Sequence, residues 1–409
     1  MKSSLLFVGA ASAFAAVALV VAGDLNPPPG APSPTPGPEP RTAINATNTP
    51  GDADSLFKIT QPGSYYLTGN ITGEIGKHGI EIAASGVTLD LMGFNLQGVV
   101  DSSSGAFVSD LVTDIAVLNG SLRGWGYRGV DMDVAANTRL ANLRVSGNAD
   151  AGIVAGDSAV VTDCTAYQNG HDGIRVGANC TVSDCTAREN DSDGIDTSSG
   201  CTIIGCSAVQ NNTDGIEAGP GSTIIDCAAY ANGDDGILAS PGCTIRGCTA
   251  KDNTGDGISA DNGCTIASCS ASNNTGNGID ASTGSTIASC SAAFNALDGI
   301  RAHTLSMVLG NTCASNGTGG DGAGIHATGI YSRIEGNNCT DSDRGIDVDL
   351  ARNMIIRNTC AGNTTNWDIA ANNYYGSINN RVGIATAAVN GDSAAGTLNS
   401  TDPHANFTY

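Results

Sequence analysis

The sequence predicts an all-β solenoid, in which short strands wind in successive coils around a narrow core. Two observations predict it: a repeat of 21 residues that is unbroken over positions 152–300, and a composition rich in glycine (55 residues) and poor in aromatic residues (4%). A fixed period of this kind is typical of solenoids, whose repeats bury their apolar faces by stacking on their neighbours. The dipeptide Gly-Ile marks the period, beginning at Gly152, Gly173, Gly194, Gly215, Gly236, Gly257, Gly278 and Gly299.

One coil can be interpreted face by face in residues 194–214. Ile195 begins one short strand, Ile203 lies on a second and Ala208 on a third. Alternate residues of a strand share a face, so these side chains and that of Cys206 are expected inside. Glycine and asparagine stand between the strands and accept left-handed backbone angles at corners. Three short strands and three corners in each repeat predict a parallel β-helix.

The beginning of the chain has the features of an export signal followed by a linker. Lys2 precedes a long uncharged stretch, which predicts a signal peptide over residues 1–23. An uncleaved membrane anchor is the alternative, because the apolar run is long. The run NPPPGAPSPTPGPEP predicts an extended, disordered linker over residues 24–51. Export would place the protein outside the cell or at its surface, where disulfides can form.

The β-helix is expected to span residues 52–369, with less regular coils on both sides of the repeat. The segment TGGDGA at 318–323 predicts a loop inserted at a corner, and residues 370–409 lose the repeat and are expected to form a cap. Terminal repeats of solenoids are usually atypical because they close an open end. Large side chains near the first end are expected to close it: Phe57, Tyr65, Tyr66, Phe94, Phe107 and Trp125.

A resemblance to a known family becomes specific at this point. The run PGSYYLTGNITGEIGKHGIEIAASGVTLDLMGFNLQG (62–98), followed by repeats of the form N-x3-GI…TI…C-x-A, resembles secreted bacterial right-handed parallel β-helix proteins of the pectate-lyase-like superfamily. The resemblance implies that fold for roughly residues 52–409. It also implies a choice among polysaccharide lyases, glycoside hydrolases, uronate epimerases and trimeric tailspikes, and the fold does not select one of them.

Two columns of the repeat are predicted to be structural. Cysteine recurs every 21 residues, and small polarisable thiols suit a buried stack. Free thiols are expected, although adjacent coils bring some cysteines within the range of a disulfide. Asparagine recurs at the same interval from Asn169 to Asn295, where one amide per coil can bond to the amides above and below.

A column of acidic residues precedes Gly-Ile and has two interpretations. Stacked carboxylates repel one another, which raises some pKa values or attracts cations, and Ca²⁺ prefers such oxygen ligands. The alternative is that Asp suits the turn, because its side chain bonds to nearby backbone. The candidate metal ligands are Asp172, Asp193, Asp214, Asp235 and Asp256.

Charged and aromatic side chains at variable outward positions are the candidates for catalysis. A polysaccharide lyase needs a cation to neutralise a uronate carboxylate and a base to remove the C5 proton. Four residues of suitable types could line one groove beside the Asn turn, although a solvated surface is the alternative: Arg175, Arg188, Tyr230 and Lys251. No cofactor-binding motif other than the Ca²⁺ candidates is present.

The net charge of −22 argues against nucleic acid and against an anionic membrane surface as partners. We therefore expect a secreted or cell-surface protein, non-catalytic, whose long face contacts carbohydrate or another envelope component. The near-perfect repeat favours binding, because an enzyme site usually breaks a repeat locally. The alternative is a polysaccharide lyase or uronate epimerase that acts on acidic glycans with or without Ca²⁺. The sequence gives no oligomeric state.

Overall fold

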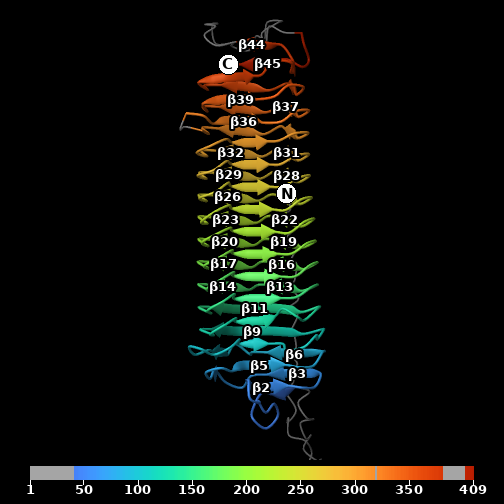
Figure 1. The fold of residues 1–409 in the computed structure, drawn as a ribbon, viewed down its shortest axis with the longest axis vertical. Helices are drawn as coiled ribbons and strands as arrows, with labels where there is room; N and C mark the ends of the chain where they lie inside the picture. Colours follow the sequence, from blue (N-terminus) through green and yellow to red (C-terminus); the bar gives the residue numbers. More distant parts are fainter. Residues whose placement is uncertain (1–40, 318–319, 381–400) are drawn as a thin grey trace, which may run out of the picture. The chain divides into compact units, whose positions relative to one another are not determined.

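A computed structural model describes residues 41–317, 320–380 and 401–409, and these residues form a single stack of β-coils (Figure 1). The ladders between the described strands are all parallel, and each strand pairs with its equivalents in the coils before and after it. The described residues contain no helix, and hence no helix able to cross a membrane. The three-strand coil predicted from the repeat is confirmed.

Each coil presents three strand faces, which we call face 1, face 2 and face 3. Face 1 is a 15-stranded sheet that contains the Gly-Ile strands. Its strands are β2 (Ser55–Ile59), β5 (His78–Ile82), β8 (Ala106–Phe107), β10 (Val130–Met132), β12 (Ile153–Ala155), β15 (Ile174–Val176), β18 (Ile195–Thr197), β21 (Ile216–Ala218), β24 (Ile237–Ala239), β27 (Ile258–Ala260), β30 (Ile279–Ala281), β33 (Ile300–Ala302), β36 (Ala323–Ala327), β39 (Arg344–Val348) and β42 (Thr365–Ile369).

Faces 2 and 3 belong to one 30-stranded sheet, because the long strands β9 (Ala116–Arg123) and β11 (Arg139–Ser146) run along both. The other strands of face 2 are β1 (Thr42–Ala43), β3 (Gly63–Tyr66), β6 (Val87–Asp90), β13 (Val160–Thr162), β16 (Thr181–Ser183), β19 (Thr202–Ile204), β22 (Thr223–Ile225), β25 (Thr244–Arg246), β28 (Thr265–Ala267), β31 (Thr286–Ala288), β34 (Met307–Leu309), β37 (Arg333–Glu335), β40 (Met354–Ile356) and β43 (Tyr374–Tyr375). Those of face 3 are β4 (Ile71–Thr72), β7 (Asn95–Gln97), β14 (Thr165–Tyr167), β17 (Thr186–Arg188), β20 (Ser207–Val209), β23 (Ala228–Tyr230), β26 (Thr249–Lys251), β29 (Ser270–Ser272), β32 (Ser291–Ala293), β35 (Thr312–Ala314), β38 (Asn338–Thr340), β41 (Thr359–Ala361), β44 (Ile378–Asn380) and β45 (Asn406–Thr408).

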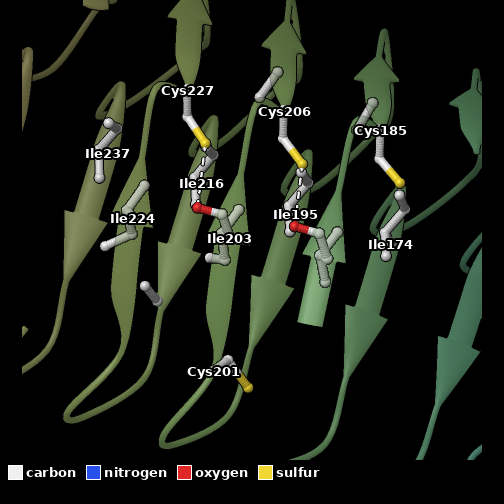
Figure 2. Close-up of a cluster of buried hydrophobic side chains, with 14 of the residues drawn as sticks. Ile174, Cys185, Ile195, Cys201, Ile203, Cys206, Ile216, Ile224, Cys227 and Ile237 are labelled. Atoms are coloured by element: carbon white, nitrogen blue, oxygen red, sulfur yellow. Dashed lines mark hydrogen bonds between the residues drawn. The ribbon is translucent and has the colours of Figure 1, made fainter. Parts of the chain in front are cut away.

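The core lies inside the coils, where one isoleucine from face 1 meets one from face 2. Figure 2 shows this pattern for Ile195 and Ile203, with the thiol of Cys206 completing the layer. All 14 cysteines are free and buried, as expected for a thiol stack. Their thiols donate to core carbonyls, as Cys227 does to the carbonyl oxygen of Ile203 at 3.6 Å. The corners adopt the backbone that the sequence predicts, since Gly200 has φ of 71°.

A ladder of asparagine amides fills the corner between faces 3 and 1. The Nδ2 group of Asn211 donates to the carbonyl of Ala187 and to Oδ1 of Asn232, and its own Oδ1 accepts from both the amide N–H and Nδ2 of Asn190. Every amide of the column is buried, so these bonds replace water for groups that would otherwise be unsatisfied. The structural role predicted for this column is confirmed.

The structure differs from the sequence expectations at both ends. Residues 42–49, expected in the linker, lie on the stack: β1 pairs with β3, and Ile44 is buried in the core. The predicted signal peptide and the Pro-rich run lie outside the described residues. At the other end β43 and β45 continue the parallel ladders, so the described part of the predicted cap adds further strands to the stack.

Two of the large side chains of the first coils, Trp125 and Phe107, have a different role from the one expected. The buried Trp125 lies between coils, where its ring packs against glycines. A β-carbon at Gly79 would lie 2.8 Å from that ring, which explains why this position has no side chain. Phe107 points outward and stacks on His78, so it closes no end of the core.

Replacing one ladder amide tests this account of the corner. We expect Asn211→Ala to lower the free energy of unfolding by roughly 2–3 kcal/mol, because buried donors of Asn190 lose their acceptor. The exposed neighbour Asn212, whose side-chain amide donates to Asp191, provides the control Asn212→Ala. Denaturant midpoints measure both variants, and equal midpoints would contradict a stabilising ladder.

Candidate functional site

The outward side of face 1 collects the charged side chains that vary between coils. Each strand presents one outward side chain at its middle, and parallel register places these side chains in a single column. From β10 to β42 the column reads Asp131, Val154, Arg175, Asp196, Glu217, Leu238, Ser259, Asp280, Arg301, His326, Asp347 and Asp368. Carboxylates predominate, so face 1 is an acidic surface.

The column of aspartates before Gly-Ile lies along one edge of face 1 and accepts hydrogen bonds from the backbone. Oδ1 of Asp193 accepts the amide N–H of Asp214 at 2.9 Å, and Oδ1 of Asp214 accepts that of Asp235 at 2.8 Å. The same bond joins Asp172 to Asp193 and Asp235 to Asp256. Each aspartate therefore binds the coil that follows it. This role is structural, but the bond reaches the next coil and not the backbone of the same turn, which the turn interpretation expected.

Several of these carboxyl groups resist ionisation. Burial raises the pKa of Asp214 to about 7, and the nearby charges of Asp235 and Asp193 add to the effect. Burial likewise raises the pKa of Asp256 to about 6, and that of the outward Asp196 to about 6. These carboxyl groups are therefore partly protonated near neutral pH, because the folded coils hold them close together and away from water.

One group of carboxylates could accept a divalent cation. Single oxygens of Asp193, Asp214 and Glu217 lie within 4.8 Å of one another. Of the other predicted ligands, Asp172 contacts His171 at 3.0 Å and the guanidinium of Arg175 at 3.5 Å, so side chains of the protein already occupy its oxygens. Oxygen donors fit Ca²⁺, but one oxygen of Asp193 and one of Asp214 already accept backbone N–H groups. The cluster remains a candidate on ligand chemistry alone.

The four predicted catalytic residues do not line one groove. Arg175 lies on face 1, beside Asp172, whereas Arg188, Tyr230 and Lys251 lie on face 3. Lys251 covers the ring of Tyr230 at 5.7 Å, and Arg188 covers that of Tyr167 at 4.2 Å. The expectation of a shared groove is wrong, because the asparagine corner turns the chain between the two sets.

The structure brings together another set of residues, which the sequence analysis did not single out. A hollow of about 450 Å³ opens on face 1, where the perfect repeat ends. We call it the His326 hollow, and its charged lining consists of Asp321, His326, Arg344, Asp347, Asp349 and Asp368. Two signals in the sequence mark this place. His326 follows a Gly-Ile dipeptide, and Arg344 stands where the repeat has aspartate.

The imidazole of His326 is held between carboxylates of the two neighbouring coils. Its Nδ1 lies 2.8 Å from Oδ2 of Asp298, and its Nε2 lies 3.1 Å from Oδ2 of Asp349. Burial alone would lower the pKa of His326, but the hydrogen bond with Asp298 and the charges of Asp347 and Asp349 raise it to about 9. The ring is therefore a cation at neutral pH, which disfavours metal ligation by this histidine.

Arg344 fixes the far side of the hollow. Its guanidinium contacts Asp347 at 3.0 Å, Asp321 at 2.7 Å and Asp368 at 3.3 Å. Arg128 occupies the equivalent position before the perfect repeat begins, and it pairs with Asp131 in the same way, at 2.8 Å. An arginine therefore replaces the edge aspartate on each side of the repeat and orders the outward carboxylate three residues later.

The raised pKa of Asp214 has a measurable consequence. A carboxyl group whose pKa is higher in the folded chain stabilises it at low pH, and this contribution is lost as the pH rises through about 7. Asp214→Asn removes the charge but keeps a side-chain oxygen that can accept the amide N–H of Asp235. Asn277 already accepts the N–H of Asp298 in this way in the same column. We expect the variant to be more stable than the native chain at pH 8, by on the order of 1 kcal/mol, and to gain less at pH 5, where the folded carboxyl group is still protonated. Thermal melts at both values test this, and the same gain at both would contradict it.

The comparisons with known proteins agree with this fold. The sequence matches the family model for the right handed beta helix region over residues 59–218 and 196–291. None of the curated protein sequences matches the chain. Among solved structures it is similar to the A-module of the mannuronan C-5 epimerase AlgE6 of Azotobacter vinelandii, with 16% identity and a TM-score of 0.41 over 76% of this chain and 89% of that one. It is also similar to the periplasmic alginate epimerase AlgG, with 13% identity and a TM-score of 0.49 over 76% and 84%.

A further similar structure is the pectate lyase Pel9A, with 16% identity and a TM-score of 0.34 over 68% of this chain and 71% of that one. At these identities the likeness concerns the fold alone. The family model, in contrast, covers more than half of the chain, and its matches include the N-terminal coils and nearly all of the perfect repeat. The chain belongs to the right-handed β-helix family.

Proposed function

We propose that this chain is a carbohydrate-binding protein whose face 1 contacts a glycan, with the His326 hollow as the principal contact. The observation that carries the proposal is the hollow itself. It gathers fixed donors and acceptors from successive coils at the point where the repeat is broken. Carboxylates accept hydrogen bonds from sugar hydroxyls, and a guanidinium donates to hydroxyl and ring oxygens. The proposal places the protein outside the cell or at its surface, in keeping with the N-terminal sequence.

The charge of the hollow selects among glycans. Its lining has four aspartates against Arg344 and the protonated His326, which gives −4 + 2 = −2. A surface of this sign repels uronate and sulfate groups and attracts amines. A neutral glycan, or one that carries amino groups, fits the His326 hollow better than the acidic glycans considered from the sequence.

Binding without catalysis is favoured by how the charged groups are already engaged. Both ring nitrogens of His326 contact carboxylates, and Arg344 contacts three of them. A general base must have its basic form populated and its nitrogen available to a substrate proton. These ion pairs instead give a rigid surface that presents carboxylate oxygens to a ligand.

Two exposed carboxylates of the hollow allow a test that leaves the core intact. We expect Asp349→Asn with Asp368→Asn to weaken binding of a chitosan oligosaccharide at least fivefold, because charged acceptors bind amines more strongly than amides do. Asp163→Asn is the control, since Asp163 is exposed at a corner between faces 2 and 3, away from the hollow. Titration calorimetry measures all three proteins, with a neutral cello-oligosaccharide in parallel. The proposal fails if neither sugar binds, or if the double variant binds as the control does.

A lyase or epimerase is the second candidate, because one hollow holds both a permanent cation and a titratable base. Arg344 would neutralise a uronate carboxylate, and His326 would remove the C5 proton once deprotonated. Deprotonation requires a pH near or above its pKa of about 9. The negative charge of the hollow opposes an acidic substrate, so we rank this function second.

Ultraviolet absorbance of unsaturated products separates the two functions. Under the binding proposal, pectate and alginate give no product at any pH, with or without Ca²⁺. A lyase would instead give product that increases from pH 7 to pH 10 and disappears in His326→Gln. An NMR assay of uronate configuration over the same range covers an epimerase, which forms no unsaturated product.

A further inference from the structure

A second hollow, of about 240 Å³, lies on face 3 near the start of the perfect repeat. Its lining includes Arg123, Arg144, Arg188 and Tyr167, and it includes no acidic residue. We call it the arginine hollow. A surface with three cations and no anion is unusual in a chain whose net charge is −22. The lining of this hollow is cationic, whereas the outward column of face 1 is rich in carboxylates, so the two surfaces favour ligands of opposite charge.

The strand register explains how residues far apart in sequence meet there. Along face 3, Arg123 pairs with Ser146, Ser146 with Tyr167, and Tyr167 with Arg188. Arg144 lies two residues before Ser146 on β11, so its side chain shares the outward side of the face. The strands β9, β11, β14 and β17 that carry these residues are consecutive in Figure 1. The three arginines thus span three coil steps, or about 14 Å at the usual strand spacing.

Two of the guanidinium groups are positioned by the protein but not neutralised by it. Arg123 donates from Nε to Oδ1 of Asn95 at 3.0 Å, and Arg144 donates from Nε to Oγ of Ser121 at 3.1 Å. Both partners are uncharged. Within residues 41–317, 320–380 and 401–409, the terminal nitrogens of Arg123 and Arg144 have no hydrogen-bond or ion-pair partner.

The third arginine is held by an aromatic ring. Arg188 lies 4.2 Å from the centroid of Tyr167 and pairs with the half-buried Glu189 of its own corner at 3.2 Å. Stacking fixes the plane of a guanidinium while leaving its N–H groups free to donate. By contrast, Arg128 and Arg344 on face 1 each contact several carboxylates. The cations of face 1 stabilise the protein, whereas Arg123 and Arg144 on face 3 keep their terminal nitrogens for a ligand.

We propose that the arginine hollow binds oxyanionic groups carried along a glycan chain, either carboxylates or sulfate esters. Planar guanidinium groups match both kinds of oxyanion and donate paired hydrogen bonds to them. Arginines spread over about 14 Å cannot all contact one small anion, so they fit successive charged groups of a polymer. The hydroxyl groups of Ser146 and Thr165 lie in the same lining and can bond to sugar hydroxyls. This inference is independent of the His326 hollow, which favours the opposite ligand charge.

A charge-matched pair of double variants tests the proposal. Arg123→Gln with Arg144→Gln removes two cations from the hollow. Arg139→Gln with Arg246→Gln removes two exposed cations from the neighbouring face 2, where neither has an acidic partner among the described residues. Both double variants therefore change the net charge equally. Thermal melts check that both remain folded.

Binding to dextran sulfate, polygalacturonate and unmodified dextran is measured by affinity electrophoresis at low salt. We expect the native chain to bind at least one of the two polyanions and not dextran. The hollow variant should bind at least tenfold more weakly, and the face 2 variant within about twofold of the native chain. Binding to only one polyanion identifies the group, carboxylate or sulfate. The proposal is overturned if the native chain binds neither, or if both double variants lose affinity equally.

Discussion

Self-stacking is the constraint on which the rest of the structure depends. In a parallel coil with a fixed period, every side chain lies one strand spacing, about 4.8 Å, from its own equivalent. A residue type can persist along a column only if it tolerates a copy of itself at that distance. Isoleucine and cysteine do so by packing, and asparagine does so because an amide is both donor and acceptor. Aspartate does so only in part, because stacked carboxylates repel each other, and this repulsion adds to burial in raising the pKa of Asp214.

The same constraint decides what could be predicted from the sequence. Columns that stack on themselves repeat visibly, so the coil, its inward isoleucines and the asparagine corner were all predicted from spacing. The two hollows were not, because each combines different residue types from successive coils. His326 meets Asp298 and Asp349, which are 28 residues before it and 23 after it, and only the register of folded strands brings them together. The prediction that Arg175 and Arg188 line one groove was wrong for a related reason. The two residues are close in sequence, but their strands lie on different faces of the coil.

The distribution of charge is a second result of this architecture. Face 1 presents an acidic column whose few cations are neutralised within the protein, whereas the arginine hollow on face 3 presents two arginines, Arg123 and Arg144, that have no acidic partner among the described residues. A solenoid permits such separation because its faces share a core but no side chains. One chain can therefore carry two surfaces of opposite preference, and a substitution on one face has little effect on the electrostatics of the other beyond a Debye length.

The column of buried thiols has a consequence for how the molecule comes apart. Fourteen cysteines are buried and spread along the stack, and a thiol reacts only when its coil opens. All of them lie between Cys164 and Cys360, so the set of thiols labelled at any moment would mark which of these coils have opened, and the coils before Cys164 carry no thiol. The buried thiols thus report the opening of individual coils, with at least one thiol in nearly every coil of the repeat.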